Sequence, residues 1–226
     1  MAGLASLVTY PALLAAGIPP VAANVSNTVG LIFSTAGSVS ASRPELTGQG
    51  HRVRRLVVFA VAGGLLGGAL LLLTPSGSFE RVVPFLIAFA SAAVLLPRPA
   101  PHPDRPSHDP RWLPAVVLAV GVYGGYFGAA AGVLLLAALL VATPESLPKA
   151  NAMKNVLLGA ANAVAAIGFV IFGHVVWSAA IPLAIGLFLG GRLGPRIVRR
   201  SPATLLRAVI SLAGLALAVK LGLSAY

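Results

Sequence analysis

Long apolar stretches, separated by short polar or proline-containing breaks, run through most of the chain. In order along the sequence they cover residues 2–16, 21–41, 56–74, 82–96, 112–143, 150–172, 175–191 and 204–223. Most of them approach the length of about 20 residues that an α-helix needs to cross a bilayer. The pattern therefore predicts an all-α, polytopic membrane protein in which helices follow one another through short turns.

A polar, proline-rich segment interrupts this pattern near the middle of the chain. It reads PRPAPHPDRPSHDP, a composition typical of an extended, solvated linker. We therefore divide the chain into a first membrane repeat at residues 1–97, a linker at 98–111 that we expect on the cytoplasmic side, and a second membrane repeat at 112–226.

The stretch at 112–143 is too long for a simple crossing. As a single helix it would measure about 48 Å, against a hydrocarbon core of about 30 Å. Its middle, GVYGGYFGAAAG at 121–132, is rich in glycine, which weakens a helix interior. We therefore predict two half-helices, at 112–122 and 133–143, that form a re-entrant hairpin. Non-helical backbone at membrane depth requires burial in protein or contact with a wet cavity.

The distribution of basic residues favours this hairpin. The chain has 16 Lys and Arg against 5 acids, a formal charge of +11, and short cytoplasmic loops of membrane proteins are enriched in Lys and Arg. If 112–143 crossed once, the two sides would share the basic residues almost equally. With a hairpin, every Lys and Arg of the loops falls on one side except Arg81 and Lys220. We therefore expect the basic loops to be cytoplasmic and the C-terminus to lie outside.

Composition excludes several classes of protein. Only 9% of the residues are charged and mean hydropathy is +0.92, whereas a soluble domain carries about 25% charged residues. The chain has no cysteine, and its histidines and acids show no metal-ligand spacing. We therefore predict no catalytic residue, no enzymatic activity, no metal and no cofactor. Because the basic residues lie in loops between apolar stretches, we expect the lipid bilayer as a partner and no nucleic acid.

The two halves also resemble each other in sequence. The aligned positions are Pro19–Pro20 with 144–148, Asn24 with Asn151, Asn27 with Lys154, Thr28 with Asn155, and Gly67–Gly68 with Gly190–Gly191. Two related halves of opposite orientation are a common transporter plan, with the substrate near the midplane where broken helices meet. In this alignment the stretch at 2–16 corresponds to the second arm of a hairpin, so we expect the first repeat to be truncated and to lack its first arm.

Lys154 is the ionisable side chain that lies well inside an apolar stretch. A central lysine costs about 2.5–3.5 kcal/mol on membrane-insertion scales, which suggests a function: with Asn151 and Asn155 it would bind an anion. The alternative is a lysine near the start of its helix that extends to the membrane surface. In the first half, Asn24, Asn27 and Thr28 would bind substrate oxygens, or they would simply hold helices together. These six residues are the predicted substrate-binding set.

Two glycine patterns allow further readings. The segment 121–132 could present backbone N–H groups to an anion, with Tyr123 and Tyr126 beside the path; close helix packing is the alternative. Gly63 and Gly67, like Gly186 and Gly190, have the small-xxx-small spacing of helix-packing faces.

Four segments of the chain are similar to those of a known family. They are SLVTYPALLAAGIPPVAANVSNTVG, GGYFGAAAGVLLLAALL, LPKANAMKNVLLGAANAVAAIGFVIFGHVVW and GLFLGGRLGPRIVRR. Through them the chain resembles the TauE/SafE family of membrane transporters. The resemblance implies a multi-pass protein of the bacterial inner membrane that exports small anions, namely sulfite, sulfonates or related organosulfur or organic anions. Uptake or exchange of small carboxylates or sulfonates is one alternative, and a membrane scaffold or assembly factor is another. Association with further copies of the same chain, as a homo-oligomer, is a further possibility that the sequence leaves open.

Overall fold

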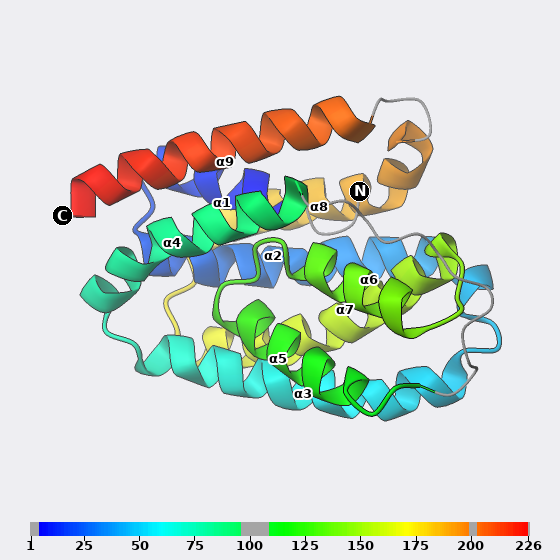
Figure 1. Cartoon of the computed structure of the whole chain (residues 1–226). Coiled ribbons are helices and arrows are strands. Elements are labelled where there is room, and N and C mark those ends of the chain that lie inside the picture. Colours follow the sequence, from blue (N-terminus) through cyan, green and yellow to red (C-terminus); the bar gives the residue numbers. More distant parts are fainter. Residues whose placement is uncertain (1–4, 96–108, 199–202, 226) are drawn as a thin grey trace.

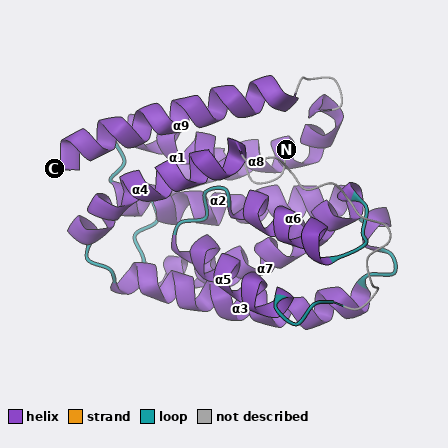
Figure 2. Ribbon diagram, viewed as in Figure 1, coloured by secondary structure: helices purple, strands orange, loops and turns teal. Residues whose placement is uncertain are grey.

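The computed structural model describes residues 5–95, 109–198 and 203–225, and every element within them is helical (Figures 1 and 2). The elements are α1 (Ala5–Ala15), α2 (Pro20–Ala41), the short 3-10 helix η1 (Pro44–Leu46), α3 (Gly50–Leu73), α4 (Ser76–Leu95), α5 (Leu113–Tyr126), α6 (Ala131–Ala142), α7 (Leu147–Phe172), α8 (Trp177–Val198) and α9 (Ala203–Ala225). The predicted all-α class is confirmed.

Prolines mark the start of three of the described α-helices. Pro20, Pro114 and Pro148 each lie in the first two positions of their helix. This is where proline is best tolerated, because the first backbone N–H groups of a helix have no partner within it. The turns that the sequence pattern predicts between apolar stretches therefore fall close to the observed helix boundaries.

Helix lengths divide the chain into full and partial membrane crossings. Within the described residues, α3, α4 and α7 are long and apolar enough to cross a bilayer. By contrast, α5 has 14 residues and α6 has 12, which correspond to about 21 Å and 18 Å, short of the core of about 30 Å. These two helices can each reach only part of the way.

The pair α5 and α6 forms the predicted re-entrant hairpin. Arg52 of α3 forms ion pairs with Asp109, just before α5, and with Glu145, just after α6. Both ends of the hairpin therefore lie at the same end of the molecule, as Figure 1 also shows. The bend itself, residues 127–130, has left-handed backbone at Gly128 (φ 80°) and at Ala130 (φ 60°).

The bend is shorter than the glycine-rich segment predicted for it. Gly121 and Gly125 lie inside α5, where they allow close contact with α3. A Cβ at Gly125 would lie 2.5 Å from the carbonyl oxygen of Gly64, and one at Gly121 would lie 3.0 Å from that of Ala60. These glycines therefore serve helix packing, and the helix continues past them because the gain from close packing outweighs their low helix propensity.

Helices α2 and α7 run antiparallel through the centre of the molecule. The backbone N–H of Val176, just after α7, donates to the hydroxyl of Ser26 near the start of α2 (2.9 Å). At the other end, the amide of Gln49 is 3.5 Å from the carbonyl oxygen of Lys149, near the start of α7. Since α2 and α7 are the aligned helices of the two halves, the halves have opposite orientations.

The helices that pack on α2 and α7 show the same repeat in their contacts. A Cβ at Gly68 of α3 would lie 3.2 Å from Ala165 of α7, and a Cβ at Gly191 of α8 would lie 3.2 Å from Ser38 of α2. Thus α3 packs on α7 as α8 packs on α2, and α4 packs on its counterpart α9. This arrangement has the form of an inverted repeat.

Candidate functional site

The side chain of Lys154 is enclosed by protein in the first third of α7. It is 3% exposed, and its neighbours Met153 and Leu157 are completely buried. Asn151 and Asn155, on the same helix, are half-buried. We call these three residues the Lys154 group. The structure places its ammonium inside the helical bundle, rather than extended along the surface of the molecule.

The polar residues predicted on α2 are also buried. Asn24 and Asn27 are 0% exposed and Thr28 is 1% exposed; we call them the Asn24 group. The amide nitrogen of Asn24 donates to the carbonyl oxygen of Tyr126 at 2.8 Å, and the hydroxyl of Thr28 donates to the carbonyl oxygen of Asn24 at 2.9 Å. Through Asn24, the group therefore supports the end of α5, where the hairpin bends.

The two groups lie apart because their helices are antiparallel. Helices α2 and α7 meet where a Cβ at Gly159 would overlap the methyl group of Thr35. Lys154 lies on one side of this crossing and Asn27 on the other. At a rise of 1.5 Å per residue, they are separated by about 20 Å along the helix axes. The structure therefore brings the predicted residues together as two groups, one towards each end of the membrane span.

Two further polar residues on α1 were not predicted from the sequence: Ser6, which contacts the bend, and Thr9, which contacts the Asn24 group. The Ser6 hydroxyl donates to the carbonyl oxygen of Gly128 at 3.4 Å. The Thr9 hydroxyl lies 2.5 Å from Oδ1 of Asn27. Their spacing of three residues puts them on one face of a helix, and this signal could have pointed to them.

Aromatic side chains hold the bend in place. The rings of Phe79 and Tyr126 have centroids 5.7 Å apart, and those of Tyr10 and Phe127 are 5.3 Å apart, both edge to face. The hydroxyl of Tyr123 donates to the carbonyl oxygen of Ala129 at 2.7 Å. Tyr123 and Tyr126, predicted beside an anion path, thus both take part in contacts that shape the hairpin.

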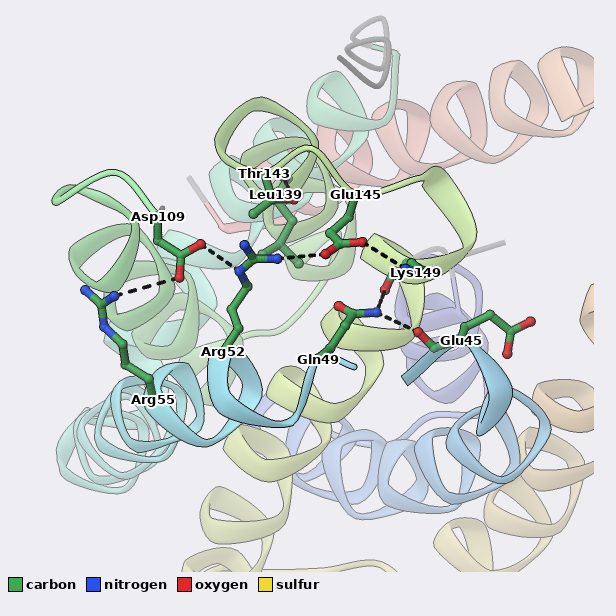
Figure 3. Close-up of polar contacts among 9 residues, drawn as sticks. All are labelled: Glu45, Gln49, Arg52, Arg55, Asp109, Leu139, Thr143, Glu145 and Lys149. Carbon is green, nitrogen blue, oxygen red and sulfur yellow. Dashed lines mark hydrogen bonds and ion pairs between the residues drawn. The ribbon is translucent and has the colours of Figure 1, made fainter. Parts of the chain in front are cut away.

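A cluster of charged side chains closes the opposite end of the hairpin (Figure 3). Nε of Arg52 is 2.6 Å from Asp109 and its Nη1 is 2.9 Å from Glu145. Arg55 reaches Asp109 at 3.8 Å and Lys149 reaches Glu145 at 3.5 Å. Arg52 is the central member, since it binds both arms of the hairpin to α3. We call these five residues the Arg52 cluster.

Comparison with known proteins identifies the family. Residues 1–221 match the family described as sulfite exporter TauE/SafE. The chain belongs to the TauE/SafE family. It is 28% identical to the probable membrane transporter protein YfcA of Escherichia coli K12 over 234 residues, which cover 98% of this chain and 83% of the relative. It is 29% identical to the probable membrane transporter protein ORF9 of a Sinorhizobium species, covering 98% and 85%. No solved structure matches the chain.

Membership of the TauE/SafE family agrees with the architecture. The protein is a membrane transporter, with apolar helices, a re-entrant hairpin and two halves of opposite orientation. Broken helices at the interface of such halves are where transporters bind their substrates. The bend of the hairpin and the buried polar groups on α2 and α7 are therefore the candidate site.

Proposed function

We propose that this transporter exports a small oxyanion, such as sulfite or a sulfonate, across the bacterial inner membrane, with its basic loops in the cytoplasm. The observation that carries the proposal is the burial of Lys154, 3% exposed, in a helix that is long and apolar enough to span the bilayer. A cationic side chain in such a position is costly and usually marks a substrate or ion pathway. An ammonium flanked by two asparagine amides is suited to an anion.

The membrane potential supplies a driving force for this direction. With a negative cell interior, outward movement of one negative charge releases about 2.3 kcal/mol per 100 mV. The five acids of the chain lie in loops or at the ends of apolar stretches. Export of a monovalent anion needs no proton relay through an embedded carboxylate, because it is downhill at equal concentrations.

These residues would contact the anion one after another as it crosses the membrane. Arginines at the basic end raise the local anion concentration. Lys154 attracts the anion, and Asn151 and Asn155 donate hydrogen bonds to its oxygens. Asn24, Asn27 and Thr28 form a second binding site for the anion on the far side of the α2–α7 crossing. The alternative direction, uptake or exchange, would use the same residues in reverse.

The test replaces Lys154 by methionine, which keeps the length and apolar volume of the side chain. We expect efflux of sulfite from proteoliposomes with a negative interior to fall at least about tenfold in Lys154→Met, and Lys154→Arg to retain part of it. The melting temperature and the size-exclusion profile check that both variants fold. Unchanged flux in Lys154→Met would remove the lysine from the mechanism. Counterflow separates exchange from export, and the absence of flux for every anion tested would favour a scaffold.

A further inference from the structure

Two buried amides in the Asn24 group have polar atoms without a hydrogen-bond partner. Oδ1 of Asn24 and Nδ2 of Asn27 are both unpaired, and both side chains are 0% exposed. Buried polar atoms are nearly always paired, so each exception calls for an explanation. The cost is greater at membrane depth, where no bulk water can replace the missing partner.

The orientation of the Asn24 amide follows from its backbone partner. Its Nδ2 donates to the carbonyl oxygen of Tyr126 at 2.8 Å. If the amide were reversed, Oδ1 would face that carbonyl oxygen, and two acceptors would repel each other. The unpaired atom of Asn24 is therefore a hydrogen-bond acceptor.

The orientation of the Asn27 amide follows from Thr9. The Thr9 hydroxyl lies 2.5 Å from Oδ1 of Asn27 and 2.9 Å from the carbonyl oxygen of Ala5. A hydroxyl has one hydrogen and can donate to only one of these oxygens. A contact of 2.5 Å lies in the range of O–H···O bonds and below that of N–H···O bonds, so the hydroxyl donates to Oδ1 of Asn27. The amide nitrogen of Asn27, with its two hydrogens, is then left as an unpaired donor.

The buried face of α2 thus offers one acceptor and one donor, three residues apart in sequence and therefore on neighbouring turns of the helix. We propose that this pair selects small oxyanions that also carry a hydroxyl. An anionic oxygen of the ligand accepts from Nδ2 of Asn27, while the hydroxyl donates to Oδ1 of Asn24. This inference rests on the proposed function and narrows its substrate class. A fully deprotonated oxyanion without a hydroxyl leaves the Asn24 oxygen unpaired.

Binding at this pair is linked to the hairpin. Asn24 also holds the carbonyl oxygen of Tyr126, and Ser6 holds that of Gly128. Both amides are closed off from solvent, so a ligand reaches them only when an element packed on α2 moves, and the bend is the element that Asn24 itself holds. Selection by the hydroxyl therefore acts on the anion during its passage.

The test compares two sulfonates that differ by one group. Isethionate (2-hydroxyethanesulfonate) and 1-propanesulfonate carry the same charge and have similar size, but a methyl group replaces the hydroxyl in the second. We expect the full-length transporter in proteoliposomes to move isethionate at least about tenfold faster, because a site built to bind a substrate hydroxyl discriminates strongly against an analogue that lacks it. In Asn24→Ala, whose folding is checked by its melting temperature, the ratio should fall towards one.

The outcomes separate this inference from the proposed function. Equal flux of the two sulfonates, or faster flux of propanesulfonate, overturns the selection by the hydroxyl and leaves anion export standing. Absence of flux for both sulfonates and for sulfite overturns the proposed function itself. If sulfite alone is transported, its flux should follow the singly protonated ion as pH is varied, and flux that follows the dianion overturns the inference. These measurements on the wild type decide the matter even if Asn24→Ala does not fold.

Discussion

The aligned glycines Gly67 and Gly190 provide a test of the packing on which the hairpin depends. Gly67 of α3 is buried against α5: a Cβ there would overlap the carbonyl oxygen of Val122 and lie 2.8 Å from the backbone nitrogen of Tyr126. Gly190 occupies the aligned position on α8, where a Cβ would meet no atom within 4 Å. The same substitution, glycine to alanine, therefore has opposite consequences at two positions of the same repeat.

The magnitude follows from these contacts. Both atoms opposite Gly67 belong to the backbone, so no side chain can rotate away, and α5 must move as a whole. Overpacking of this kind costs about 1–3 kcal/mol. For a chain of this size that corresponds to a decrease in melting temperature of about 2–12 °C. At Gly190 alanine creates no overlap and gains up to about 1 kcal/mol of helix propensity, so stability should be unchanged or slightly increased.

The assay is thermal unfolding of the purified protein in detergent, with both variants measured beside the wild type. Gly77→Ala is a further control, because a Cβ at this glycine near the start of α4 also meets nothing within 4 Å. If Gly67→Ala and Gly190→Ala changed the melting temperature by the same amount, the close approach of α3 and α5 would not be the source of stability that we infer.

The other predictions concern the charged cluster and the topology. Arg52→Gln leaves Asp109 and Glu145, whose side chains are 7% and 18% exposed, facing each other without their shared cation; we expect a loss of about 1–3 kcal/mol in thermal unfolding. Arg55→Gln, whose side chain is 48% exposed, should cost no more than about 1 kcal/mol, and equal losses would refute the central role of Arg52. Because the chain has no cysteine, single-cysteine labelling can test the topology: Thr47→Cys and Ser146→Cys should react from one side of the membrane, Ser76→Cys and Ser178→Cys from the other.

The hairpin could be predicted from the sequence because two independent signals agreed. The stretch at 112–143 is too long for one crossing, and the basic loops fall on one side only if that stretch turns back. The position of the bend could not be predicted. From the neighbouring sequence alone, Gly121 and Gly125 look like helix breakers. Their role in packing follows from the position of α3 against them, which the sequence does not give.

The Arg52 cluster at the base of the hairpin could not be predicted from the sequence. Arg52, Asp109 and Glu145 are far apart along the chain, and each looks like an ordinary loop charge. They meet because the hairpin returns to the end where α3 begins. Charge pairing of this kind depends on topology, so it could be inferred only after the hairpin had been fixed.

For the six predicted binding residues, the sequence could not give their separation in space. Aligning the halves puts Asn24 and Asn27 at the same depth within their repeat as Asn151 and Lys154. Since the repeats are inverted, equal depth in sequence means opposite ends in space, about 20 Å apart along the helix axes. A small oxyanion is much shorter than this and cannot touch Lys154 and Asn24 together. If the transporter works as we propose, the two groups must act one after the other. Loss of Lys154 should then weaken capture of every anion alike, whereas loss of Asn24 should change which anion passes.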